Sequence, residues 1–196
     1  MMFMGTRTAF VLAAALSGSA AFAQDTWNPC GLDPAQMAQE VRENIAGSWT
    51  VKNGLGMFTI MGDAMPMPPD ADAAADFVLK GDELWVTDWA EGSDREYLVR
   101  IGGTDGEIAE AFDKLNAFPT ISIIPAEDVA TVAGCTLADA PHLQLSGTLS
   151  MDGTVLQFQA DLMVLEENLM TGAMTFLMTG DSPGFLDGVR QITLRR

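Results

Sequence analysis

Polar and apolar residues alternate strictly along the last third of the chain. From Leu143 to Met151 every second residue is apolar or small, and the residues between them are polar. A period of two places successive side chains on opposite faces of a strand. The pattern therefore predicts a strand with one buried face and one face in water.

The same alternation returns in the segments that follow. Asp152-Gly153 has the composition of a hairpin turn, and the polar residues from Glu166 to Asn168 indicate a second turn. Between and after these turns, apolar residues again occupy alternate positions in three segments: Leu156–Val164, Met170–Met178 and Val189–Arg195. We expect an antiparallel meander.

The earlier half of the chain predicts shorter strands and three helices. Asn53-Gly54 and Gly81-Asp82 have turn chemistry, and the stretch 62–76, rich in Ala, Pro and Asp, reads as a loop. A helix is expected to begin at Asp33-Pro34 and to end before Gly47. Two shorter helical patterns cover 106–115 and 127–132. The expected strands are 48–51, 57–61, 77–80, 84–88, 96–101 and 120–124.

About nine or ten strands in one small domain would leave sheet edges with unpaired backbone N–H and C=O groups. Closure into a barrel pairs these groups and removes the edges. Consecutive hairpins close easily, whereas a Greek-key sandwich needs longer crossings. The expected fold class is mainly β: an antiparallel meander closed into a barrel, with a short N-terminal helix and one or two helical inserts. A sandwich is the competing solution.

The first 23 residues read as a signal peptide. Arg7 precedes an apolar run, and small residues end at Ala21-Phe22-Ala23 in the A-x-A pattern of a cleavage site. The expected organisation is therefore a signal peptide over 1–23 and a single domain over 24–196, released into the periplasm or secreted. No later apolar stretch reaches the roughly 18 to 20 residues that cross a bilayer, so we do not expect the domain to span a membrane.

The chain has two cysteines, Cys30 and Cys135. An even count in an oxidising compartment favours one disulfide, which would hold the N-terminal segment against the body of the domain.

The charge is strongly acidic, with 27 Asp and Glu against 10 Lys and Arg, a formal charge of −17. Such a chain repels phosphate backbones, so nucleic acid is not an expected partner. The composition leaves cationic or neutral ligands and basic protein partners.

Gly47-Ser48-Trp49 begins the first expected strand, directly after the N-terminal helix, and Arg190 lies in the last strand. This pattern resembles that of the lipocalins and the wider calycin group, in which a Gly-x-Trp strand closes one end of the barrel and a late arginine packs over the tryptophan. Arg190 shares its parity with Ile192 and Leu194, so it should point inward. The resemblance implies that Arg190 stacks on Trp49 as a structural residue.

A barrel of about eight strands has an interior just wide enough for packed side chains or for one small ligand. The leading hypothesis is a lipocalin-like protein that binds a small apolar or amphipathic ligand, without a cofactor and without covalent catalysis. The candidate ligand-binding residues are those in phase with a dry interior: Trp49, Leu145, Leu149, Leu156, Phe158, Met174, Phe176 and Met178.

Two alternatives stay open. The first is an interaction module with a filled barrel, which would act on a basic partner through its acidic surface or the 62–76 loop. The second is a Cu(I) carrier, because thioethers are soft ligands and four methionines lie close together at Met57, Met61, Met65 and Met67.

The four aspartates Asp63, Asp70, Asp72 and Asp76 lack the spacing of an EF-hand. His142, the only histidine, has no nucleophile motif around it.

Overall fold

The structure is a computed structural model, and it describes residues 27, 29–30, 32–89, 95–102, 105–116, 125–151, 154–180 and 186–196. Three sequence predictions lie outside these residues: the signal peptide over 1–23, the Asp152-Gly153 turn and the strand over 120–124.

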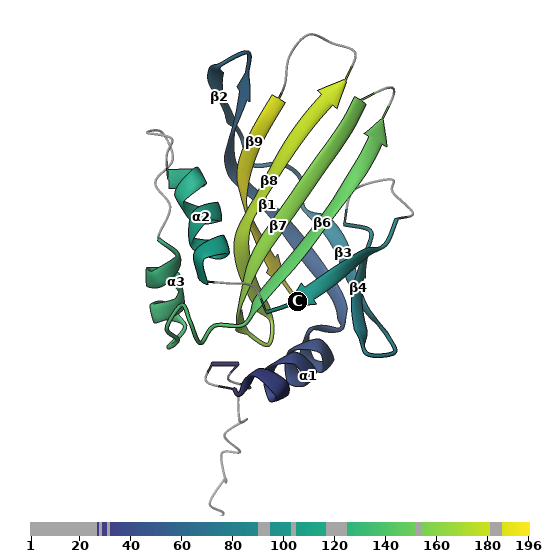
Figure 1. Ribbon diagram of the computed structural model, residues 1–196, viewed down its shortest axis with the longest axis vertical. Coiled ribbons are helices and arrows are strands. Elements are labelled where there is room, and N and C mark those ends of the chain that lie inside the picture. Colours follow the sequence, from purple (N-terminus) through teal and green to yellow (C-terminus); the bar gives the residue numbers. More distant parts are fainter. Residues whose placement is uncertain are drawn as a thin grey trace, which may run out of the picture.

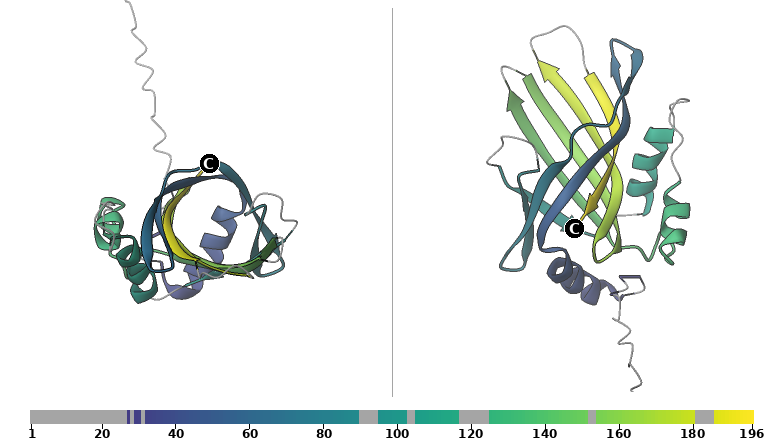
Figure 2. Two further views of the ribbon diagram at one scale, coloured as in Figure 1. Left: turned by 90° about the horizontal axis from the view of Figure 1, so that it is seen from above. Right: turned by 180° about the vertical axis from the view of Figure 1, so that it is seen from behind.

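Within this part of the chain, eight antiparallel strands close into a barrel (Figure 2). The ring is completed by β1, which pairs with β3 on one side and with the last strand, β9, on the other. The mainly β meander barrel is therefore confirmed, and the sandwich is wrong. The eight strands are β1 Gly47–Ile60, β3 Ala73–Lys80, β4 Glu83–Thr87, β5 Tyr97–Ile101, β6 His142–Met151, β7 Thr154–Glu166, β8 Leu169–Gly180 and β9 Leu186–Arg195.

Strand β1 corrects two sequence predictions. Asn53-Gly54 is not a hairpin turn, because β1 runs unbroken through it and carries a bulge between Asn53 and Gly56. Beyond the bulge, β1 leaves β3 and pairs with β2, Asp63–Met67, while its other edge stays paired with β9 as far as Ile60 (Figure 1). The stretch 62–76 is thus only partly a loop, since it also contains β2 and the start of β3.

The three helices are placed as expected. Helix α1, Pro34–Ile45, begins where Asp33 Oδ1 accepts a hydrogen bond from the backbone N–H of Gln36 at 3.0 Å. Its apolar face, including Val41 and Ile45, belongs to the main core, so α1 closes one end of the barrel (Figure 1). Helices α2, Asp105–Asn116, and α3, Ala126–Val132, cover part of the outer wall.

A second, smaller core lies between α2, α3 and the outer wall. Phe112 and Met163 are central to it, and the disulfide between Cys30 and Cys135 packs at its edge with a Cα–Cα distance of 5.5 Å. The predicted disulfide is confirmed. It fixes the N-terminal segment to the helical layer on the outside of the barrel.

The closed end is built around Trp49, which is 2% exposed. Its indole N–H donates to the carbonyl of Ile45 at 2.8 Å, and its ring meets Phe77 edge to face. The arginine over this ring is Arg196, whose guanidinium carbon lies 4.5 Å from the ring centroid. Arg196 also donates to the carbonyls of Asn44 and Ala46. The chain end thus fastens α1 to β1.

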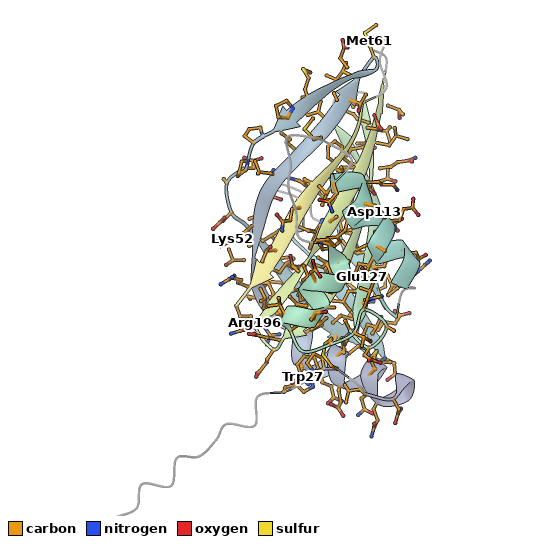
Figure 3. The ribbon with its side chains drawn as sticks, turned by 90° about the vertical axis from the view of Figure 1, so that its left-hand side faces the viewer. Trp27, Lys52, Met61, Asp113, Glu127 and Arg196 are labelled. Carbon is orange, nitrogen blue, oxygen red and sulfur yellow. A yellow bond between two sulfur atoms is a disulfide. The ribbon has the colours of Figure 1, made fainter. Side chains whose placement is uncertain are left out.

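The predicted stacking of Arg190 on Trp49 is therefore wrong, although its predicted inward direction is confirmed. Arg190 pairs with Gly56 and Met174, several residues from Trp49 along β1. Figure 3 shows Arg196 near the closed end and Met61 at the far tip of the β1–β2 hairpin.

Candidate functional site

The inward-facing side chains fall into two zones along the barrel. Because paired residues of an antiparallel sheet share a face, the register places all eight predicted lining residues on the inner face. Trp49, Leu145 and Phe158 are buried, whereas the predicted lining residues farther from α1 are only half-buried: Leu149, Leu156, Met174, Phe176 and Met178. With Phe58, which has the same direction and exposure, these half-buried residues form what we call the cup.

Two aromatic rings on the inner face lie against glycines of neighbouring strands. A Cβ at Gly147 would overlap the Tyr97 ring, which meets Phe158 edge to face at a centroid distance of 5.0 Å. Across the barrel a Cβ at Gly188 would overlap the Phe176 ring. Both rings lie against strand backbone where no side chain stands. They occupy the space that a side chain at either glycine would need.

Sequence reasoning missed Tyr97 as a site residue. It is the only tyrosine of the chain, it faces inward with Val99, and it is 7% exposed. Its hydroxyl has no hydrogen-bond partner among the described residues. The sequence did carry a signal, because this tyrosine lies in phase with the apolar residues of its strand. A buried hydroxyl without a hydrogen bond costs about 1–3 kcal/mol of folding free energy.

Arg190 is the charged group of the inner face, and it is 8% exposed. One terminal nitrogen donates to the carbonyls of Gly54 and Pro68, both at 3.3 Å, and Nε has no partner among the described residues. The other terminal nitrogen is 4.0 Å from Asp70, whose side chain is 72% exposed. Burial lowers the pKa of Arg190, and the Asp70 carboxylate partly opposes that shift.

A groove of about 700 Å³ lies on the outer wall, beside the C-terminal turn of α2. Its outward side chains are mostly uncharged and polar, with Lys114 at its margin and a few apolar members. They are Thr59, Ser146, Thr148, Gln157, Gln159, Thr175, Leu177, Asp187 and Val189, and the inward-facing residues Gly147, Phe158, Phe176 and Gly188 also border the groove. The groove is a second place where a ligand could bind, and tests of the cup must distinguish the two.

Asp161 is buried on the outer face of β7, near Glu107 and Lys114 of α2. Its carboxylate accepts hydrogen bonds from the side-chain amides of Gln144 at 3.0 Å and Gln159 at 3.0 and 3.2 Å. Burial raises the pKa of Asp161, and these hydrogen bonds partly oppose the increase. The ionised group is therefore a cost to folding at neutral pH.

Replacing Asp161 by asparagine is expected to raise the free energy of unfolding at pH 7. The variant keeps Oδ1 as acceptor for both glutamines and removes the buried charge. Because the folded-state pKa lies above the ordinary value of 3.8, wild-type protein recovers this stability as protons bind at lower pH. Urea unfolding from pH 7 toward pH 4 should show the difference narrowing. The exposed Asp113→Asn control should change stability by less than about 0.5 kcal/mol, and a D161N variant that is less stable at pH 7 contradicts this reading.

The methionines considered for copper do not share one face. Met65 pairs with Phe58 and Met67 with Gly56 on the inner side, whereas Met57 pairs with Pro66 on the outer side. Met61 is 79% exposed in the hairpin turn. The register therefore separates the thioethers that a Cu(I) carrier would need to bring together.

The other metal and catalytic candidates are also dispersed. Among the described residues, no group of three or more His, Cys, Asp and Glu side chains is placed to hold a metal ion. Asp72 instead forms an ion pair with Lys52 at 2.8 Å. His142 is buried on the outer face of β6, opposite Met163 of the smaller core.

The fold thus defines a closed, antiparallel eight-stranded barrel with one end covered by α1 and half-buried apolar side chains on its inner face toward the other. No protein-family model, curated protein or solved structure matches the chain. Among the described residues, no helix has both the length and the apolar character needed to cross a bilayer.

Proposed function

We propose that this is an exported, lipocalin-like protein that binds one small apolar or amphipathic ligand in the cup and does no covalent chemistry on it. One observation carries the proposal: apolar inward side chains change from buried to half-buried along the barrel, away from α1. Half-buried Leu, Met and Phe on a concave inner wall are the surface that an apolar ligand covers. Met174 and Met178 add flexible side chains that adapt to related ligands.

Export is part of the proposal. The A-x-A pattern ending at Ala23 and the disulfide between Cys30 and Cys135 both fit an oxidising compartment, the periplasm or the medium. The helix-capped end, with Trp49 under Arg196, supports placing the chain near the calycins.

The competing function is an interaction module with a filled barrel. The close packing of Tyr97 over Gly147 favours it, because that part of the interior is occupied by side chains. This alternative predicts that the mature protein binds no apolar probe.

A neutral fluorescent probe, N-phenyl-1-naphthylamine, tests the proposal with two neighbouring variants. Leu149→Trp places an indole inside the cup, whereas Thr148→Trp places the same indole in the outer groove. We expect L149W to weaken probe binding roughly 5- to 150-fold, because overpacking costs about 1–3 kcal/mol. T148W should bind the probe as the wild type does.

The opposite pattern places the site in the outer groove. Absence of probe binding to correctly folded wild-type protein, verified by near-UV circular dichroism, supports the filled interaction module instead.

A further inference from the structure

The inward positions of the eight barrel strands carry a single charged residue, Arg190. Its neighbours at these positions are otherwise apolar or uncharged. The charge is positive in a chain with 27 acidic and 10 basic residues. An interior cation is costly to desolvate, so it needs a counter-charge or a full set of hydrogen bonds.

The structure gives Arg190 only part of that compensation. Its two hydrogen bonds, to the carbonyls of Gly54 and Pro68, are both long at 3.3 Å, and Nε is unpartnered among the described residues. The Asp70 carboxylate is 4.0 Å away and largely in water, where its attraction is screened. A guanidinium has five N–H donors in a planar fork that matches a carboxylate or phosphate.

The register places this incomplete site at the edge of the cup. Arg190 pairs with Met174, a cup residue, and lies one inward position closer to the covered end than Gly188, which supports the Phe176 ring. In the ring of eight strands, β9 lies opposite β5, so the unpartnered Tyr97 hydroxyl faces the same interior from the other side. The inner face of the barrel therefore carries one cationic donor, beside the cup residue Met174, and one neutral donor on the strand opposite.

We infer that the ligand of the cup carries an anionic head group, such as a carboxylate, and that Arg190 binds it while the apolar body lies among the cup residues. This inference rests on the proposed function and specifies its ligand class. The acidic net charge alone would favour a different class of ligand, because an acidic protein attracts cationic amphiphiles.

Three probes with the same sixteen-carbon chain separate these possibilities: hexadecanoate, 1-hexadecanol and hexadecyltrimethylammonium. Each is titrated against N-phenyl-1-naphthylamine bound to the mature protein, at concentrations below its micelle or solubility limit. We expect the anion to bind most tightly and the cation least tightly. Arg190→Met should lower hexadecanoate affinity roughly 10- to 100-fold relative to hexadecanol, the range of a lost charge-assisted hydrogen bond.

Arg195→Met is the matched control, because Arg195 is exposed on the outer face of the same strand and its loss changes the net charge equally. R195M should keep the wild-type order of the three probes. Tyr97→Phe should weaken both hexadecanoate and hexadecanol, since a neutral hydroxyl donor serves either head group.

The outcomes are distinct. If the naphthylamine does not bind, the proposed function fails. If it binds but hexadecanol or the cation matches hexadecanoate, only the anionic ligand class is overturned. If R190M does not fold, the order of the three affinities on wild-type protein still tests the inference. If R190M and R195M fold and lose hexadecanoate affinity equally, the net charge sets the preference and the interior guanidinium does not.

Discussion

Replacing Cys30 and Cys135 together by alanine is expected to lower the free energy of unfolding by about 2–5 kcal/mol. The disulfide joins residues 105 positions apart, so its loss frees a long loop in the unfolded chain. It also opens the smaller core, where Cys135 is buried against α3. Urea unfolding of the oxidised wild type and the double variant measures the difference.

A thiol reductant supplies the control for this prediction. It should destabilise the wild type by a similar amount and leave the double variant unchanged. A double variant within about 0.5 kcal/mol of the wild type would mean that the helical layer holds without the covalent link.

Replacing Trp49 by alanine should lower the free energy of unfolding by about 3–5 kcal/mol, the usual loss for a large buried aromatic side chain. The substitution removes the hydrogen bond to the carbonyl of Ile45, the contact with Phe77 and the surface under Arg196. It opens a cavity where α1 covers the barrel. Chemical unfolding followed by far-UV circular dichroism gives the value.

Trp85→Ala is the matched comparison, since Trp85 is a half-buried tryptophan on the outer face of β4, opposite Leu98. We expect a loss of no more than about 1–2 kcal/mol for this partial burial. Equal losses for the two variants would show that Trp49 does not support the closed end.

The C-terminal meander could be predicted because one rule governs it throughout. Leu143, Leu162, Gly172 and Ile192 are paired in turn across four strands, and each lies in the apolar phase read from the sequence. A shift of one residue would turn every apolar side chain to water, so the pattern determines the register.

The first strands could not be predicted in the same way. The bulge after Asn53 changes the phase within β1, and a local alternation rule reads such a break as a turn. The residues of β2 are exposed apart from the half-buried Met67, so no buried face marks it as a strand. Backbone pairing with β1 forms it, and the side-chain pattern carries no trace of that pairing.

The sequence predicted which side chains of the candidate site face inward, but not how deeply each of them is buried. Leu145 and Leu149 occupy the same apolar phase, yet only the first is fully buried, because depth along the barrel depends on which end α1 covers. The alternation of the last strand correctly predicted that the Arg190 side chain points inward, in phase with Ile192 and Leu194. It could not show that Arg196, past the end of β9, reaches Trp49 instead.

The central claim is that the ligand site lies inside the barrel, in the cup. The most direct test is methyl NMR of [13C-methyl]methionine protein during the naphthylamine titration, with resonances assigned by single substitutions. Met174 and Met178 line the cup, Met163 lies in the smaller core outside the barrel, and Met61 is at the hairpin tip. The account predicts ring-current shifts at Met174 and Met178 and unchanged signals from Met163 and Met61; probe binding that leaves Met174 and Met178 unshifted would contradict it.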